Sequence, residues 1–329
     1  MSEKIWLIGT GDIASQHARV LDGLGKGYLV VGRGDVSASI FEEKTKRSVM
    51  RGGVEGYIDK SGEIPEFAIV TVYPLSLKDV TIFLLKKGVK NILVEKPAGI
   101  NHKEIEEIAQ AARKNDAHVY VAYNRRFYAS VDRAKAIIEE DGGLTSFNFE
   151  FTEWGHVIEK LKKPQDELRG WFMANSTHVV DLAFYLGGLP MCFSSIISGS
   201  LPWHPCAAQY AGSGVTASNV PFTYKANWDS AGRWSLEFLT KNRKLIFEPI
   251  EELKEQKKGS IAVEKVDIDD SLDREYKAGL FLQMKAFLNG DYENMISIEE
   301  QARISNVYEL METTGIYSSS DDWNSFYSK

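Results

Sequence analysis

KIWLIGTGDIA, residues 4–14, decides the fold prediction, because an apolar run ends there directly in a glycine turn. The turn reads GTGDIA, residues 9–14, which follows the pattern GxGxxA. Such glycines permit a tight turn from strand to helix and let backbone amides approach a pyrophosphate at the helix amino terminus. We therefore predict a dinucleotide site made by Gly9, Thr10, Gly11, Asp12 and Ile13, with an ordinary strand-to-helix turn as the alternative.

Short apolar runs alternate with helical spacing along the first third of the chain. The apolar runs cover residues 4–9, 28–32, 67–72, 91–95 and 118–123, and helical patterns cover residues 11–24, 77–88 and 101–116. This alternation predicts an α/β fold with a doubly wound parallel sheet, helices lying on both faces. Asn101 with Glu104 predicts a capped helix start, and Lys86-Lys87-Gly88 predicts a helix end.

The pattern changes after about residue 145. Residues 145–154, 191–198, 221–229, 232–240 and 243–250 look like strands separated by Gly, Asn and Asp turns, and residues from about 275 to 315 return to helical spacing. These runs predict a largely antiparallel sheet with hairpins. Residues 203–219, rich in Gly, Ser and Ala, suit either a flexible lid or a set of hairpin turns. We expect two domains, 1–122 for the dinucleotide and 123–329 for substrate and oligomer contacts.

Composition limits the class of partner. The chain has 39 basic and 46 acidic residues and a net charge of -7, which argues against a nucleic acid or an anionic membrane. Cys192 and Cys206 make neither a disulfide framework nor a metal cluster, so no metal is expected. The amino terminus lacks the pattern of a signal peptide, and no apolar run approaches the ~20 residues of a membrane helix. We expect a cytoplasmic protein that acts on a small solute.

The second apolar run, YLVVGRGD at residues 28–35, bears on the choice of dinucleotide. An acidic residue at the end of this strand accepts a hydrogen bond from the ribose 2′-hydroxyl, whereas a nearby Arg accommodates a 2′-phosphate. The strand ends in Arg33 and Asp35 is set back, so Arg33 with Ser37 favours NADP over NAD. The alternatives are an Asp35 that folds back on the ribose and an Arg33 that is a solvated loop charge.

The fifth apolar run ends in Glu95-Lys96-Pro97. Pro cannot donate to a sheet ladder and a buried strand needs no Lys, so these residues mark the carboxyl end of a strand and a shaped turn. Ligands bind at that end of an open parallel sheet. Pro97 restricts Lys96 to an extended conformation, so its ammonium is a candidate for contact with a ligand there. A solvated Lys at a strand end is the alternative.

These motifs, with YNRRF at residues 123–127 and HVVD at residues 178–181, resemble those of the Gfo/Idh/MocA oxidoreductases from residue 5 to about 315. The resemblance implies an N-terminal Rossmann domain and a C-terminal α/β domain with a largely antiparallel open sheet. It implies a dehydrogenase of the EC 1.1.1 type, which transfers a hydride between nicotinamide and a carbinol carbon of a sugar, polyol or nucleotide-sugar derivative. It also implies a homodimer or homotetramer that pairs through the open sheet face.

The resemblance assigns roles around the cofactor. It puts Glu95 and Lys96 beside the nicotinamide, with Lys96 bonded to the reacting hydroxyl and Pro97 often in cis. Tyr73 and Pro74 are expected to pass beneath the nicotinamide or the adenylate ribose. Lys78 stands where the family usually has a His, and it meets either a phosphate or solvent.

The segment NSTHVVDLAFYLGG, residues 175–188, contains a second group of candidate site residues. The resemblance implies that His178 is a general acid/base, which suits an imidazole that titrates near neutrality, and a core or capping His is the alternative. The family's usual Asp four residues earlier is Ala174 here, which leaves Lys96 and His178 for proton transfer and Asn175 to orient substrate. Asp181, three residues after His178, either holds the imidazole tautomer or lies at a helix surface.

Tyr123, Arg126 and Trp171 complete the expected substrate site, because aromatic faces stack on sugar rings and Arg donates to hydroxyl or phosphate oxygens. We therefore predict an NADP-dependent dehydrogenase, with NAD as the second choice of cofactor. Two other functions remain open: a non-catalytic NAD(P)-binding regulator of the same fold, and a reductase of an imine or unsaturated substrate.

Overall fold

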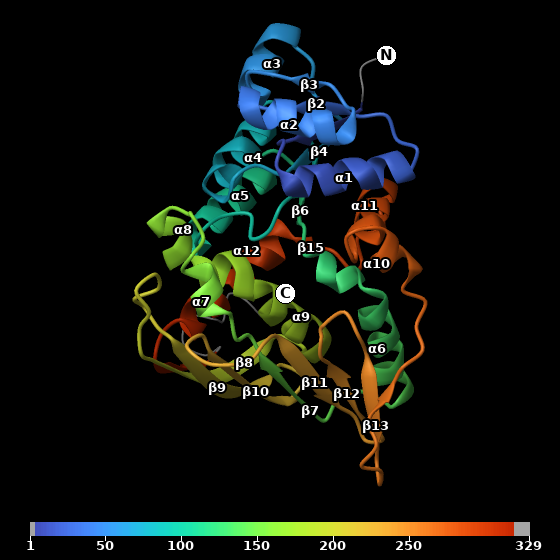
Figure 1. The fold of residues 1–329 in the computed structure, drawn as a ribbon, viewed down its shortest axis with the longest axis vertical. Helices are drawn as coiled ribbons and strands as arrows, with labels where there is room; N and C mark the ends of the chain where they lie inside the picture. Colours follow the sequence, from blue (N-terminus) through green and yellow to red (C-terminus); the bar gives the residue numbers. More distant parts are fainter. Residues whose placement is uncertain (1–3, 319–329) are drawn as a thin grey trace. The chain divides into compact units, whose positions relative to one another are not determined.

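The computed structural model describes residues 4–318, and the chain divides into two compact units (Figure 1). The first unit comprises the residues up to 127 together with residues 271–302. The second comprises residues 128–270 and the residues from 303 onward. The division predicted from sequence, at residue 122, assigned the returning segment 271–302 to the second domain, whereas the structure packs it into the first unit.

The first unit is built on a seven-stranded sheet with the strand order β15-β6-β5-β4-β1-β2-β3. Its strands are β1 (Ile5–Ile8), β2 (Leu29–Val31), β3 (Val49–Met50), β4 (Phe67–Val70), β5 (Asn91–Val94), β6 (His118–Val121) and β15 (Ile296–Ser297). Strands β1 to β6 pair in parallel, and β15 pairs antiparallel with β6. The predicted doubly wound Rossmann sheet is confirmed, because the order 3-2-1-4-5-6 reverses direction between β1 and β4.

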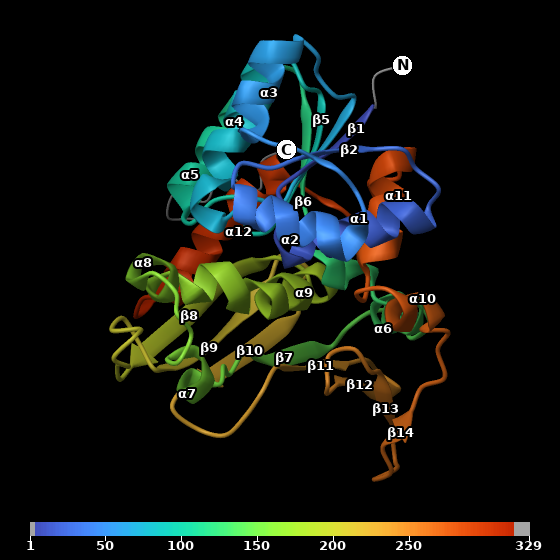
Figure 2. The same cartoon turned by 45° about the horizontal axis from the view of Figure 1, so that its top comes forward.

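Helices cover both faces of this sheet (Figures 1 and 2). The helices of this unit are α1 (Asp12–Gly23), α2 (Asp35–Thr45), α3 (Gly53–Ser61), α4 (Leu77–Lys86), α5 (His102–Lys114), α10 (Ser271–Glu275), which contacts α11, and α11 (Leu280–Asn289), with 3₁₀ turns η1 (Pro74–Ser76) and η2 (Asn124–Phe127). Leu21 and Phe287 of α1 and α11 are fully buried in one core with Leu7 and Ile69 of the sheet. Helices α4 and α5 pack together and against β4, β5 and β6.

Two helix boundaries confirm the sequence signals. The backbone N–H of Glu104 donates to Asn101 Oδ1 at 2.9 Å, and Glu104 Oε2 accepts from the backbone of Ile100 at 3.1 Å, so α5 begins with reciprocal capping bonds. Helix α4 ends at Lys86, and Gly88 has a φ of 94°. These contacts fix the two helices that flank β5.

The second unit is built on a nine-stranded sheet with the order β14-β13-β12-β11-β7-β10-β9-β8-β16. Its strands are β7 (Ser146–Glu150), β8 (Pro190–Ser198), β9 (Gln209–Thr216), β10 (Pro221–Asn227), β11 (Ser235–Leu239), β12 (Arg243–Phe247), β13 (Lys254–Lys257), β14 (Glu264–Lys265) and β16 (Gly315–Ser318). Neighbours are antiparallel except β7 and β10. The largely antiparallel sheet is therefore confirmed, and residues 209–216 of the Gly-rich stretch form β9.

The helices of the second unit are α6 (Ala129–Glu140), α7 (Gly155–Ile158), α8 (Gln165–Arg169) and α9 (Thr177–Gly187), and a π-helical turn, η3 (Phe172–Ser176), leads into α9. Helix α12 (Ile298–Met311) begins in the first unit and ends in the second. Phe184 of α9 packs at right angles to Phe147 and Phe222, with ring centroids 6.2 and 5.3 Å apart. Helix α9 thereby lies on one face of the sheet (Figure 2).

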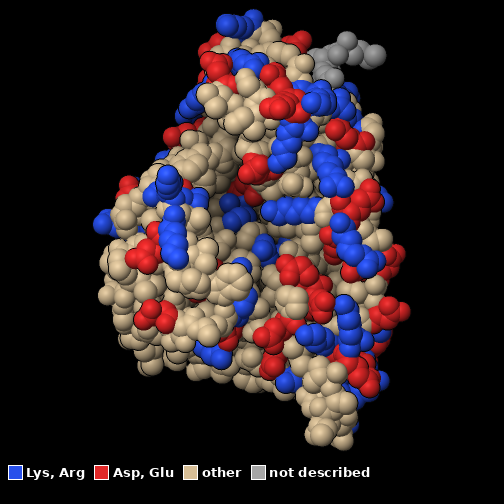
Figure 3. Space-filling model, in the orientation of Figure 1, with Lys and Arg blue, Asp and Glu red and all other residues tan. Residues whose placement is uncertain are grey.

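Acidic and basic side chains are interspersed over the face drawn in Figure 3. In residues 4–318, no helix combines the length and the apolar character needed to cross a bilayer.

Candidate active site

The glycine turn lies where the carboxyl ends of three strands meet. The Gly9 N–H donates to Val31 O at 2.9 Å, and the Thr71 N–H donates to Ile8 O at 2.7 Å. Gly9 has a φ of 124°, and a Cβ there would lie 2.5 Å from Thr71 O, so only glycine fits. Gly11 caps α1 in an extended conformation, and a Cβ there would meet nothing within 4 Å. The turn is thus crowded at Gly9 and has open space at Gly11. Open space next to backbone N–H groups fits a dinucleotide pyrophosphate.

The end of β2 carries a paired arginine. Arg33 Nη2 donates to Glu55 Oε1 at 2.7 Å, and the Arg33 side chain is exposed. Ser37 Oγ donates to Gly34 O at 3.1 Å and accepts from Thr10 Oγ1 at 3.0 Å, which ties the glycine turn to the start of α2. The two residues predicted for a ribose phosphate, Arg33 and Ser37, therefore lie just after β2 and in the first turn of α2.

Lys96 follows β5 directly, and its neighbours hold the turn. The Glu95 N–H donates to Val70 O at 2.9 Å. His17 of α1 is fully buried, and its Nε2 lies 3.0 Å from Glu95 Oε1. The Lys96–Pro97 peptide bond is cis, and Lys96 is partly buried. Contacts from β4 and α1 to Glu95 therefore hold the backbone next to Lys96 in place.

Gln301 supports the same turn. Its side chain is fully buried, and Nε2 donates to Pro97 O at 3.4 Å and to Tyr123 Oη at 3.3 Å. Tyr123, predicted as a substrate residue, is itself only 1% exposed. Tyr123 and Gln301 therefore support the Lys96 turn from the interior of the first unit.

Two other predicted residues of the first unit lie in 3₁₀ turns or next to them. Tyr73 is 44% exposed and precedes Pro74, which starts η1 after β4. Arg126 lies half-buried in η2, after β6. Both therefore follow the carboxyl ends of strands of the parallel sheet, where ligands bind in such folds.

Asp35 and Lys78, for which the sequence left a cofactor contact or a solvated position open, both have oppositely charged neighbours. Asp35 is exposed, and its Oδ1 lies 3.5 Å from Arg51 Nε. Lys78 lies 3.4 Å from Glu107 Oε2 and 3.8 Å from Glu104 Oε1 of α5. The amine of Lys78 is therefore engaged by helix carboxylates.

A buried carboxylate organises the second unit next to α9. Glu153 follows β7 and is 1% exposed. Its Oε1 accepts from Ser176 Oγ at 2.8 Å and from Asn175 Nδ2 at 2.9 Å, and both donors belong to the π-helical turn η3. Burial raises the pKa of Glu153, and the donors Ser176, Asn175, Arg233 and Trp234 oppose that rise. Single π-helical turns are frequent at functional sites, and here the turn aims both donors at one carboxylate.

Arg233 completes this cluster. Its Nη1 lies 3.3 Å from Glu153 Oε2, and its guanidinium lies 4.8 Å from the ring centroid of Trp154 and 4.6 Å from that of Trp234. The Trp154 indole N–H donates to Gly232 O at 3.0 Å, which fastens the loop that carries Arg233. The guanidinium is therefore held by one carboxylate and two aromatic faces.

His178, the second residue of α9, lies beside this cluster. Its side chain is buried at 7% exposure, and its ring centroid is 6.3 Å from that of Trp234. Asp181 is 1% exposed, so it does not lie at the helix surface. Trp171 is half-buried and directly precedes η3, and Ala174 lies within that turn.

Glu153 and Arg233 were not predicted from sequence. They are 80 positions apart, and the pairing of β7 with β11, which sets Ser235 opposite Glu150, brings them together. A Glu directly after an apolar alternating strand, in FNFEFTEW, was the available signal for a buried acid. Nothing in the spacing pointed to Arg233.

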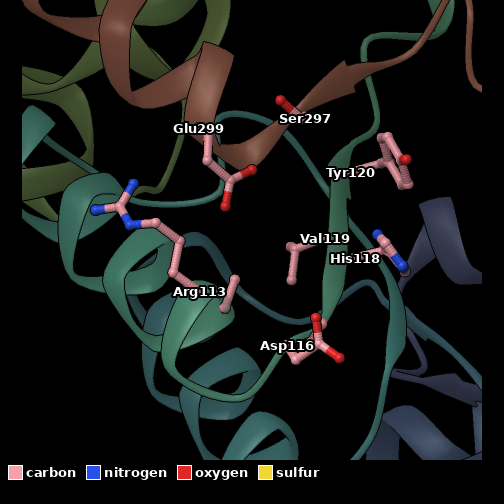
Figure 4. Close-up of a pocket in the computed structure, with 9 residues that line it drawn as sticks. Arg113, Asp116, His118, Val119, Tyr120, Ser297 and Glu299 are labelled. Atoms are coloured by element: carbon pink, nitrogen blue, oxygen red, sulfur yellow. The ribbon is translucent and has the colours of Figure 1, made fainter.

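A separate hollow of about 380 Å³ lies at the amino end of β6 (Figure 4). Arg113 and Glu299 lie on one side of the strand, and His118 and Tyr120 point to the other side. These polar groups do not converge, and the hollow is at the opposite end of β6 from the glycine-turn edge of the sheet. It therefore lies outside the candidate site.

Replacing Glu153 by Ala is expected to lower the free energy of unfolding by about 3 kcal/mol, because three donors, Asn175, Ser176 and Arg233, lose a buried acceptor. Glu153→Gln keeps an oxygen for Ser176 and Asn175 and should lose less than half as much. Urea unfolding followed by Trp fluorescence measures both, with the exposed Glu159→Ala as the control. Equal stability of Glu153→Ala and the control would contradict the expected role of this acceptor.

Comparisons with known proteins agree with this geometry. Residues 4–123 match the family model described as oxidoreductase family, NAD-binding Rossmann fold, that is, Gfo/Idh/MocA. Trans-1,2-dihydrobenzene-1,2-diol dehydrogenase of Xenopus tropicalis is 26% identical over 111 residues, which are 34% of this chain and 33% of that protein. The match thus spans about a third of that relative.

Solved structures share the fold over nearly the whole chain. Levoglucosan dehydrogenase in complex with NADH and levoglucosan is similar with a TM-score of 0.79 and 16% identity, over 95% of this chain and 98% of that one. UDP-N-acetylglucosamine 3-dehydrogenase from Acidithiobacillus ferrooxidans is similar with a TM-score of 0.72 and 13% identity, over 95% and 97% of the two chains. At these identities the likeness shows a common fold.

Proposed function

We propose that the chain is a nicotinamide-dependent dehydrogenase of a sugar, polyol or nucleotide-sugar derivative. The premise is that residues 4–123 match the oxidoreductase family with an NAD-binding Rossmann fold, Gfo/Idh/MocA. The observation that carries the proposal is Lys96, which follows β5 on a turn held by His17, Val70 and Gln301. The substrate class is supported by levoglucosan and UDP-N-acetylglucosamine dehydrogenases of the same fold.

The chemistry follows from the residues. A bound nicotinamide cofactor supplies the hydride acceptor or donor. Lys96 donates a charge-assisted hydrogen bond to the reacting oxygen and stabilises its negative charge in the transition state. His178 takes or returns the hydroxyl proton, and Asn175, held by Glu153, orients the substrate together with Arg126 and Trp171. Tyr123 acts behind the Lys96 turn rather than on the substrate.

We further propose that Arg33 and Ser37 admit the 2′-phosphate of NADP, while NAD also binds. Arg33→Ala should raise the Kd of NADPH at least tenfold and leave that of NADH nearly unchanged, because a charge-assisted bond to the 2′-phosphate contributes about 1.5–3 kcal/mol. Glu55→Gln removes the carboxylate 2.7 Å from Arg33 and should tighten NADPH. Energy transfer from Trp residues to the reduced nicotinamide measures each Kd. Equal losses for both cofactors in Arg33→Ala would refute the preference.

The same titration tests the function as a whole. Binding of NADPH or NADH, followed by absorbance changes when sugars, polyols and nucleotide sugars are supplied, is the expected result. A protein that binds neither cofactor is not a dehydrogenase of this type. Tight binding with no turnover on any of these substrates would point instead to a cofactor-sensing regulator.

A further inference from the structure

A cationic pocket opens beside the first turn of α1. It has a volume of about 640 Å³ and joins two segments that are far apart in the sequence. Its charged lining residues are Asp12 and Arg19 of α1, Lys44 of α2, and Arg274, Glu275 and Lys277 of the returning segment. Four basic side chains thus line the pocket against two acidic ones.

The carboxylate of Asp12 makes a cation favourable beside the glycine turn. Asp12 is the first residue of α1, and its carboxylate opposes the binding of any phosphate at that helix terminus. Lys44 Nζ lies 3.0 Å from Asp12 Oδ1 and compensates this charge. Further cations stabilise the two negative charges of a dinucleotide pyrophosphate, because backbone amides supply only partial charge.

The returning segment is fastened to the first unit on both sides of Lys277. Before it, Tyr276 packs on α1, where the Arg19 guanidinium lies 5.4 Å from the Tyr276 ring centroid. After it, Asn124 Nδ2 donates to Ala278 O at 2.7 Å, and Asn124 lies in η2, which follows β6. The backbone of Lys277 is therefore fixed between α1 and the carboxyl end of the sheet.

The amine of Lys277 is an uncompensated charge. Its side chain reaches solvent, yet the surrounding protein lowers its pKa, Arg125 adds to that effect, and Glu95 opposes it. Glu95 acts only through its charge, because its carboxylate is engaged by His17. Within residues 4–318, no carboxylate lies at ion-pair distance from the Lys277 amine. Lys277 is exposed, so its amine is accessible to an anionic ligand and can donate a charge-assisted hydrogen bond to it.

We propose that Lys277 binds the pyrophosphate of the dinucleotide, so that the segment returning after the second unit completes the cofactor site of the first. The proposal rests on the proposed function, since it assumes a dinucleotide at the glycine turn. Residues 271–302, which pack into the first unit, would thereby add a cation to this site.

Lys277→Met in the full-length protein tests the assignment by cofactor affinity rather than activity. We expect the Kd of NADH to rise at least tenfold, the Kd of ADP-ribose to rise equally, and that of AMP, which has no pyrophosphate, to stay within twofold. The dependence of NADH affinity on salt should weaken, because one cation has been removed. Lys285→Met, an exposed lysine of α11, is the matched control, and Lys277→Arg should restore most of the affinity.

The outcomes separate this proposal from the proposed function. Wild-type protein that binds neither NADH nor NADPH overturns both. Normal wild-type binding with an unchanged Kd in Lys277→Met overturns the Lys277 assignment and leaves the dehydrogenase proposal intact. A loss for NADH with no loss for ADP-ribose would place Lys277 at the nicotinamide and also overturn the assignment. Circular dichroism of each variant verifies the fold. If Lys277→Met fails to fold, the Kd values of Lys277→Arg for NADH, ADP-ribose and AMP are compared with those of wild type instead.

Discussion

Lys96→Met is expected to lower the turnover number by about a thousandfold, while the Kd of the cofactor changes by less than about threefold. Lys96 donates to the developing oxyanion, and removal of one such donor costs about 10²–10³ in rate. Methionine keeps the length of the apolar side chain and removes the charge. The turnover number is measured by nicotinamide absorbance at saturating substrate, with whichever sugar-type compound the screen identifies.

The fold should survive this substitution, because neighbours of Lys96 make the contacts that hold the turn. Glu95 is engaged by His17 and Val70, and Pro97 O accepts from Gln301. Lys103→Met, an exposed position in the first turn of α5, is the control for a lost lysine charge. An unchanged turnover number in Lys96→Met would remove this residue from the mechanism, whatever the cofactor affinity.

The Rossmann sheet was predictable because its determinants are local. GTGDIA predicts a tight turn from strand to helix, and strand and helix periods alternate around it. The helix start at Asn101 was equally readable, since the cap and its partner Glu104 are three residues apart. Such features need no knowledge of distant contacts.

The second-unit cluster was not predictable, because its partners meet only through sheet pairing. Glu153 and Arg233 come together when β7 pairs with β11, and a single sequence does not specify which strands are neighbours. His178 was proposed as a site residue through a resemblance, whereas its proximity to Trp234 was not predicted. The return of residues 271–302 was missed for a related reason: β15 is two residues long, too short for any periodic signal.

Glu312→Gln is expected to stabilise the second unit at alkaline pH and to have little effect near pH 4.5. Glu312 follows α12, and burial, with a smaller contribution from Glu309, raises its pKa from 4.5 to about 8. Its Oε1 lies 3.9 Å from Nε2 of the fully buried His204. His204 Nδ1 donates to Ala207 O at 2.9 Å, so Nε2 is unprotonated in the neutral ring, and burial lowers the pKa of His204. A protonated Glu312 therefore faces a neutral imidazole.

The sign of the pH dependence follows from the raised pKa. The folded state holds a proton on Glu312 that the unfolded state releases, so the stabilising contribution is complete below about pH 4.5, declines as the pH rises, and is lost above about pH 8. The total loss is on the order of 5 kcal/mol, because each tenfold change in a proton-binding constant corresponds to about 1.4 kcal/mol. Glutamine carries no such proton and avoids the loss.

The difference in Tm between Glu312→Gln and wild type, measured at each pH from about 4.5 to about 9, cancels the titration of groups that do not contact Glu312. We expect it to grow from near zero to roughly 8 °C and to level off above about pH 8. Glu309→Gln should move this plateau to lower pH, because it removes a like charge that raises the pKa of Glu312. The exposed Glu264→Gln is the control and should follow wild type throughout. A Tm difference that stays constant from about pH 4.5 to about pH 9 would contradict the raised pKa of Glu312. Glu312 would then already be ionised at the acidic end, and the pair of Glu312 and His204 would not be neutral.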